Sequence, residues 1–276
     1  TCEDTIKNKK IDIALFPAGG DTSLKFAPIF SSYGAVVIDN SSAWRMNKDV
    51  PLVVPEVNPE DLKNHNGIIA NPNCSTIQAM VPLKALLDNY GIKRIVYSTY
   101  QAVSGAGMQG IKDLEDGLKG LEPKKFPYQI AGNCLPHIDV FLENGYTKEE
   151  MKMIEETRKI LHSNDLKITA TTVRVPVLNS HSESINVELN SPFELEDIFK
   201  LFEKTEGLTV YDNVNELKYP TALNVSGKDD VYVGRIRRDF SLDNGLNLWV
   251  VADNIRKGAA LNAVQIAEVL IKNEWL

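Results

Sequence analysis

The chain has 276 residues, 43% of them hydrophobic and 24% charged, which is typical of a globular protein with one large domain or two ordinary ones. Its 30 basic and 37 acidic side chains give a net charge of −7, the wrong sign for a protein that binds nucleic acid through phosphates. No apolar run approaches the roughly 18 residues that span a bilayer, so we expect no membrane partner.

Cysteine and histidine usage narrows the chemistry. The three cysteines, Cys2, Cys74 and Cys134, are an odd set too small for a disulfide framework, which favours a reducing cytoplasm. The four histidines are scattered, and none stands at the spacing of a metal-binding motif. We therefore expect no metal site.

The first part of the chain predicts a parallel α/β sheet. Short apolar runs alternate with amphipathic segments, and Gly34 and Gly91 follow the segments as stop signals. The predicted strands cover 11–16, 35–39, 52–54 and 67–71, and the predicted helices cover 22–33 and 75–90. This alternation is typical of a Rossmann-like, nucleotide-binding domain.

After Gly91 the pattern changes to strands with alternating buried and exposed residues, which predicts a sheet with one face covered by helices. The predicted strands cover 94–101, 167–175, 184–189, 232–238 and 246–252, and the predicted helices cover 108–119, 148–162, 194–203 and 256–272. We assign residues 1–73 and 252–276 to the nucleotide-type domain, with the last helix returning to it, and 74–251 to a second, α+β domain.

The most informative segment is Asn71-Pro72-Asn73-Cys74-Ser75-Thr76, where a thiol lies between a strand and a helix. Free N–H groups and the helix dipole at such a position lower the pKa of a cysteine, so Cys74 is a candidate nucleophile. The alternative is a buried, inert cysteine. His181, in a polar connection between two predicted strands, is the candidate base for Cys74, although a structural histidine remains an open alternative.

Taken together, six motifs closely resemble those of bacterial-type aspartate-β-semialdehyde dehydrogenases. They occupy the segments 16–20, 39–46, 71–76, 98–107, 174–184 and 252–260, so the resemblance extends along essentially the whole chain. It implies a dinucleotide-binding domain followed by a catalytic and dimerisation domain, with NADP as the cofactor and a homodimer or a dimer of dimers as the assembly.

The resemblance also implies roles for individual residues. Cys74, His181 and Gln101 correspond to catalytic residues, and Arg174 and Glu149 to residues that bind the substrate carboxylate and ammonium groups. The phosphate-binding residues correspond to Arg45, Asn73 and Lys152, and the cofactor-binding residues to Ala18, Gly19, Gly20, Ser104, Gly105 and Asn254. Without the resemblance, these arginines and the Glu149/Lys152 pair are typical of surface charges, and the glycines of ordinary turns.

The chain departs from the family in its cofactor site. The family begins with a glycine-rich turn that holds the cofactor pyrophosphate at a helix N-terminus, and this turn is missing here. We expect at least one βαβ unit of roughly 30 residues to be absent before Thr1, which leaves the first domain incomplete. Pro17 stands where the family usually has serine, and it removes one N–H near the nicotinamide.

The implied reaction is the reversible, NADP-dependent reduction of aspartyl β-phosphate to aspartate β-semialdehyde and phosphate through a Cys74 thioester, in lysine, methionine and threonine biosynthesis. One alternative is a related acyl-phosphate reductase, such as one acting on N-acetylglutamyl phosphate, whose acylated nitrogen carries no charge for Glu149 to meet. Another is a non-catalytic subunit, because the cofactor site is incomplete.

Overall fold

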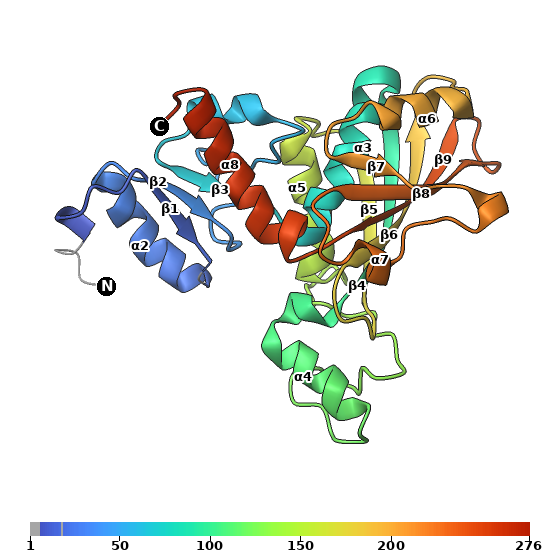
Figure 1. Cartoon of the computed structure of the whole chain (residues 1–276), viewed down its shortest axis with the longest axis horizontal. Coiled ribbons are helices and arrows are strands. Elements are labelled where there is room, and N and C mark those ends of the chain that lie inside the picture. The colour runs from blue at the N-terminus through green and yellow to red at the C-terminus, as the bar shows by residue number, and fades with distance from the viewer. Residues whose placement is uncertain (1–5, 18) are drawn as a thin grey trace.

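The computed structural model of the chain describes residues 6–17 and 19–276, so Cys2 and Ala18 lie outside the described residues. Two sheets lie side by side, and α4 with the loop after it projects beyond them (Figure 1). In the described part of the chain, no helix has the length and apolarity needed to cross a membrane.

The first sheet is parallel, as predicted, with the order β1-β2-β3. Its elements are β1 (Ile13–Phe16), α2 (Gly20–Ser32), β2 (Val36–Asp39) and β3 (Ile68–Ala70). The C-terminal helix α8 (Leu261–Lys272) packs against this sheet, where Ala263, Ile266 and Leu270 meet Val36 and Ile38 in one apolar cluster. The last helix therefore covers the first sheet, although it follows β3 by about 200 residues in the chain.

The second sheet is mixed and has the order β5-β4-β6-β9-β8-β7. Its strands are β4 (Ile92–Gln101), β5 (Lys167–Arg174), β6 (His181–Leu189), β7 (Leu208–Val210), β8 (Val231–Asp239) and β9 (Gly245–Ala252). One face packs against α3 (Cys74–Tyr90), α5 (Lys148–Ile160) and α6 (Leu195–Glu203). The side chains between them, such as Met80, Met153 and Tyr97, are fully buried, so this interface is the main core.

Shorter elements connect these layers. They are η1 (Pro59–Asn64), η2 (Val103–Ala106), α4 (Met108–Gly117), η3 (Val214–Glu216), α7 (Ala222–Val225) and the π-helical turn η4 (Arg256–Ala260).

Three local predictions differ from the structure. Residues 52–54 are buried but form no strand, because Pro51 and Pro55 bound the segment and lack N–H donors, and only Leu52 bridges to Ala70. The last helix does not begin as an α-helix at Arg256 but with the π-turn η4. His181 is the first residue of β6, whereas the sequence analysis placed it in the preceding connection.

The π-turn η4 carries a buried lysine that ties the C-terminal helix to the first sheet. Lys257 is 1% exposed, and its Nζ donates to both carboxylate oxygens of Glu56, to Gln265 Oε1 at 2.7 Å and to Asn262 Oδ1 at 3.0 Å. Asn262 in turn donates to Asn71 Oδ1 at 2.6 Å, at the end of β3. This network joins α8 to the chain just before Cys74.

We expect Lys257→Met to lower the free energy of unfolding by about 3–5 kcal/mol, because it keeps the side-chain volume but leaves the Glu56 carboxylate buried without its cation. Urea denaturation followed by circular dichroism measures the change. The matched control is Lys200→Met, which removes an exposed partner of Asp197 on α6 and should cost less than about 1 kcal/mol. Equal losses in the two variants would contradict a structural role for the buried pair.

Candidate active site

The site begins at the turn between β3 and α3. The strand ends at Ala70, and the Asn73 side chain caps the helix, with Oδ1 accepting the N–H of Ser75 at 3.0 Å and of Thr76 at 3.4 Å. Cys74 is therefore the first residue of α3, with its thiol at the positive end of the helix dipole.

Cys74 lines a cavity of about 570 Å³ at the junction of the two sheets. Ten of the residues singled out from the sequence line this one cavity: Arg45, Asn73, Cys74, Gln101, Ser104, Gly105, Glu149, Lys152, Arg174 and Asn254. They come from segments spread over more than 200 residues of sequence, so the fold brings them together.

The pKa of the Cys74 thiol is raised, whereas the sequence analysis expected it to be lowered. Burial raises the pKa of Cys74 to about 12, and the nearby charge of Glu149 adds to this effect. Arg174, Arg45 and the N–H of Ser75 act in the opposite direction but are outweighed. In this arrangement the helix N-terminus does not by itself produce a thiolate, because desolvation is the larger contribution.

Glu149 lies at the centre of one hydrogen-bonded group. Its Oε1 accepts Asn73 Nδ2 at 2.9 Å and Gln101 Nε2 at 3.1 Å, and its Oε2 lies 3.0 Å from Lys152 Nζ. Burial alone raises the pKa of Glu149, but Lys152 and the two amides outweigh burial and lower it. Glu149 is therefore a buried carboxylate that stays ionised near neutral pH.

Arg45 is held from the other end of α5 by Glu156, which the sequence analysis did not single out. Glu156 is 1% exposed; its Oε1 lies 3.1 Å from Arg45 Nη1, and its Oε2 accepts the N–H of Asn73 at 2.7 Å. Arg45 also donates to the carbonyl oxygens of Asn71 and Asn40. The only signal in the sequence is the seven-residue spacing from Glu149, which places both carboxylates on one helix face.

Arg174 and His181 lie together at the ends of β5 and β6. Arg174 Nη1 donates to the carbonyl oxygen of Ala102 at 2.7 Å, while its Nε has no partner among the described residues. A Cβ on Gly105 would lie 3.0 Å from Arg174 Nη1 and 3.1 Å from His181 Cε1, so both side chains pack against bare backbone. The guanidinium keeps donors free beside the cavity.

His181 is fully buried behind Gly105 and does not itself line the cavity. The N–H of Ala102 donates to His181 Nδ1 at 3.0 Å, so the neutral ring carries its proton on Nε2, which has no partner among the described residues. Burial, together with the charge of Arg174, holds the pKa of His181 well below its usual value. In this arrangement the ring donates at Nε2, whereas the sequence analysis expected a base, and no described hydrogen bond joins it to Cys74.

Of the residues predicted to bind the cofactor, Ser104, Gly105 and Asn254 line the cavity. Asn254 Nδ2 donates to Ser104 Oγ at 3.0 Å, and its Oδ1 accepts the N–H of Ser180 at 2.8 Å. Gly19 and Gly20, at the start of α2, do not line it, and Ala18 lies outside the described residues. In the described parts of the chain, no three His, Cys, Asp or Glu side chains are placed to hold a metal ion.

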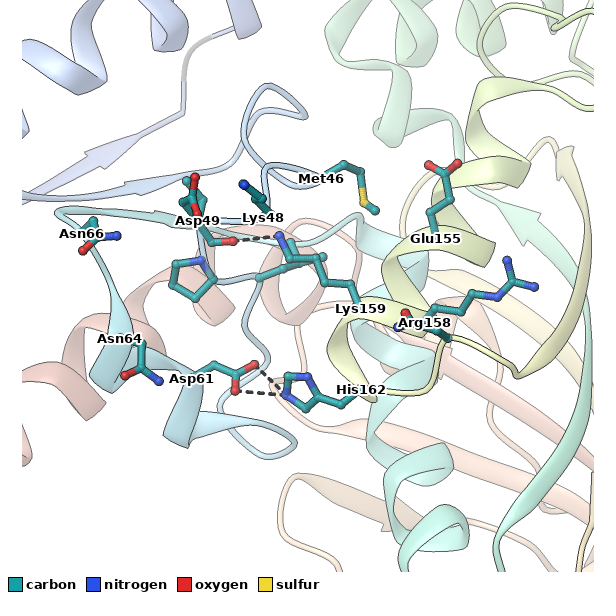
Figure 2. Close-up of a pocket in the computed structure, with 14 residues that line it drawn as sticks. Met46, Lys48, Asp49, Asp61, Asn64, Asn66, Glu155, Arg158, Lys159 and His162 are labelled. Carbon is teal, nitrogen blue, oxygen red and sulfur yellow. Dashed lines mark hydrogen bonds and ion pairs between the residues drawn. The ribbon is translucent and has the colours of Figure 1, made fainter.

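A larger cavity, of about 830 Å³, lies away from Cys74 between the loop after β2, η1 and the end of α5. Figure 2 shows Lys159 of α5 and His162, just after the end of that helix, reaching across it. Lys159 Nζ donates to the carbonyl oxygens of Arg45, Asn47 and Val50, each at 2.7 Å, and His162 pairs with Asp61. These two side chains thus join the end of α5 to the loop after β2 and to η1.

Family models and several known proteins match the chain. Residues 1–65 match the family model "Semialdehyde dehydrogenase, NAD binding domain", and residues 83–257 match "Semialdehyde dehydrogenase, dimerisation domain". The aspartate-semialdehyde dehydrogenase of Aquifex aeolicus is 59% identical over 273 residues, a match that covers 96% of this chain and 80% of that protein.

Solved structures show the same fold. Aspartate semialdehyde dehydrogenase II of Vibrio cholerae, described as complexed with ASA, is 50% identical and superposes with a TM-score of 0.91 over 96% of this chain and 80% of that one. The enzyme of Candida albicans, described with NADP, is 27% identical and gives a TM-score of 0.77 over 96% and 78%. The chain therefore belongs to the aspartate-semialdehyde dehydrogenase family.

Proposed function

We propose that this chain catalyses the reversible, NADP-dependent conversion of aspartate β-semialdehyde and phosphate into aspartyl β-phosphate. The observation that carries the proposal is one cavity lined by a thiol, a buried carboxylate and four cations, namely Cys74, Glu149, Arg45, Lys125, Lys152 and Arg174. A small amino acid with an aldehyde, a carboxylate and an ammonium group, followed by a phosphate dianion, matches this set of charges.

The substrate is oriented by two opposite charges. Arg174 pairs with the α-carboxylate, because it lines the cavity and only its Nη1 has a described hydrogen bond, to the carbonyl oxygen of Ala102. Glu149 accepts hydrogen bonds from the ammonium group, since it is a buried and ionised carboxylate that lines the cavity. Gln101, which hydrogen-bonds Glu149, orients the acyl group beside Cys74.

The chemistry passes through sulfur. Cys74 loses its proton and its sulfur adds to the aldehyde carbon, which turns the aldehyde oxygen into an oxyanion. We assign His181 Nε2–H, which has no partner among the described residues, as the donor for that oxygen; because the ring lies behind Gly105, this contact requires the Gly105 segment to shift when the substrate binds. Loss of hydride gives a thioester, a phosphate oxygen then attacks the thioester carbonyl, and the Cys74 thiolate leaves. The proton first lost from the thiol passes to solvent and is the one released overall, and the leaving thiolate takes up the proton that hydrogen phosphate gives up on attack.

The described lining fits the nicotinamide end of the cofactor. Ser104, Gly105 and Asn254 offer a hydroxyl, bare backbone and an amide with no charge, beside Cys74 and Gly258. These groups would hold the nicotinamide, and Gly19 and Gly20, which follow Pro17 at the start of α2, would hold the cofactor outside the cavity that Cys74 lines. When bound, the cofactor accepts the hydride in this direction of the reaction and supplies it in the other. The Candida albicans relative is described with NADP.

Phosphate binding is assigned to Arg45, Lys152 and Asn73. Arg45 uses three of its donors on Asn71, Asn40 and Glu156 and keeps others for a ligand in the cavity. Lys152 Nζ has three donors, of which two meet carboxylates. A dianion between these two cations is placed to attack the thioester.

The second sheet supplies the surface that we assign to the homodimer. The matched family model is a dimerisation domain, which indicates a homodimer. We assign residues 74–251 to the catalytic and dimerisation domain, and 1–73 with 252–276 to the dinucleotide-binding domain. The sheet face opposite α3 exposes Tyr100, which packs against Trp249, and is the surface we assign to the partner copy. A dimer of dimers, a cytoplasmic location and a role in lysine, methionine and threonine biosynthesis belong to the same proposal.

The close relatives favour this function over the two alternatives. Both the Aquifex aeolicus and the Vibrio cholerae proteins are named for the semialdehyde and not for an acetylated substrate or a non-catalytic subunit. The buried Glu149 agrees with a free ammonium group, because an acetylated nitrogen would leave this carboxylate unpaired by the substrate.

The first test is Cys74→Ser. We expect phosphate-dependent reduction of NADP with aspartate β-semialdehyde, followed by absorbance of the reduced nicotinamide, to fall by at least about 1,000-fold, because the nucleophile is lost. Cys134→Ser, which changes an exposed cysteine outside the cavity, is the matched control and should keep wild-type rates. Turnover retained in Cys74→Ser would reject the thioester route.

The second test concerns the thiol pKa. Since the pKa of Cys74 is raised to about 12, we expect its alkylation by iodoacetamide to speed up roughly tenfold per pH unit between pH 7 and 10, without a plateau. Mass spectrometry of the Cys74 peptide measures the rate in the protein without substrate, and the exposed Cys134 reports on the reagent. A plateau below pH 8 would mean that the helix N-terminus outweighs burial.

The third test is Glu149→Gln. We expect kcat/KM for aspartate β-semialdehyde to fall by roughly 100-fold or more, because the variant removes a buried charge that meets the ammonium group and Lys152. Glu150→Gln is the control on the same helix. Its carboxylate accepts the N–H groups of Thr147 and Thr172, away from the cavity, so activity should change little. Equal losses in both variants would point to damage to α5 and not to substrate recognition.

A further inference from the structure

Each cation assigned to phosphate already has a carboxylate partner within the chain. Arg45 pairs with Glu156 at 3.1 Å, and Lys152 Nζ lies 2.8 Å from Asp139 Oδ2 and 3.0 Å from Glu149 Oε2. Three carboxylates, Glu149, Glu156 and Asp139, thus accompany the four cations of the cavity lining, Arg45, Lys125, Lys152 and Arg174. A phosphate dianion that binds to Arg45 or Lys152 therefore competes with a carboxylate of the chain for that cation.

Two of the three carboxylates are fixed. Glu149 accepts two side-chain amides besides Lys152, and its side chain is 6% exposed. Glu156 accepts the N–H of Asn73 besides Arg45, and its side chain is 1% exposed. Moving either would leave buried donors without partners, which is costly.

Asp139 differs from both. It lies in the loop between α4 and α5, its side chain is 31% exposed, and it lines the same cavity as Cys74. Apart from Lys152, its one described hydrogen bond is local, from the N–H of Val140 to Oδ1 at 2.9 Å. Its carboxylate can therefore swing into solvent without leaving a buried group unsatisfied.

We propose that Asp139 is an internal competitor of phosphate: its carboxylate occupies Lys152 until the substrate phosphate displaces it, and it thereby sets the affinity of the site for phosphate. This inference rests on the proposed function of the cavity. Asp139 holds the Lys152 ammonium group in place beside Glu149 in the absence of substrate. A phosphate dianion attracts the Lys152 ammonium group more strongly than the single charge of Asp139 does, whereas a monoanion does not. The arrangement therefore selects for phosphate over monoanions.

The backbone allows a clean test. Asp139 has φ 68°, in the left-handed region, where asparagine and glycine are both well tolerated. Asp139→Asn keeps the side-chain shape and the Oδ1 acceptor but removes the charge, and Asp139→Gly removes the whole group without backbone strain. If one of the two folds poorly, the other still reports on the competition.

We expect Asp139→Asn to lower the KM for phosphate by about three- to tenfold, because the competing anion is gone, while the KM for aspartate β-semialdehyde stays within about twofold of wild type. Asp139→Gly should likewise lower the KM for phosphate and leave the KM for aspartate β-semialdehyde within about twofold of wild type. Asp197→Asn, which breaks an exposed pair with Lys200 on α6, is the matched control and should alter neither constant. A phosphate KM that is unchanged or raised in the Asp139 variants overturns the proposal.

Phosphate binding without turnover separates this proposal from the proposed function. The shift of the melting temperature with inorganic phosphate should reach half its maximum at a several-fold lower phosphate concentration in Asp139→Asn than in wild type. If wild type shows no phosphate-dependent turnover, the proposed reaction is wrong. If wild type turns over normally but the half-maximal phosphate concentrations coincide, only the role of Asp139 is wrong.

Discussion

The arrangement of the whole site depends on one buried carboxylate. Glu156 accepts the N–H of Asn73 and pairs with Arg45, and so joins α5 both to the turn that carries Cys74 and to the loop after β2. These partners lie 83 and 111 residues away in the chain. Since a buried charge without its partners is strongly destabilising, the turn, the arginine and the helix are held in one geometry.

The same helix determines the electrostatics of the cavity. Glu149 lies near its start and Glu156 seven residues later, so two buried negative charges face the thiol side of the molecule. The cations that line the cavity come from the same helix, Lys152, and from other segments, Arg45, Lys125 and Arg174. One consequence is a thiol that stays protonated at rest, because neither burial nor Glu149 favours a second negative charge beside it.

The sequence predicts the parallel first sheet and the main helices because hydrophobic periodicity and glycine stops are local signals. Residues 52–54 show where this fails: three buried apolar residues look like a strand, but the flanking prolines cannot donate to a ladder. In the site, the Asn73–Cys74 cap is a local feature and could be predicted. The pairings of Glu156 with Arg45 and of Asp139 with Lys152 depend on tertiary contacts that no local pattern encodes.

The π-turn at the start of the C-terminal helix adds a constraint on the evolution of the chain. A Cβ on Gly258 would lie 3.1 Å from the Cβ of Cys74, so this position accepts a side chain only if the nucleophile moves. Gly258, in the turn before α8, therefore packs directly against the nucleophile Cys74, although 184 residues separate them in the chain. Any variant that lengthens, shortens or straightens this turn changes the space around the sulfur of Cys74. The substitutions that the start of the last helix accepts are therefore limited by the need to keep Cys74, the first residue of α3, in place.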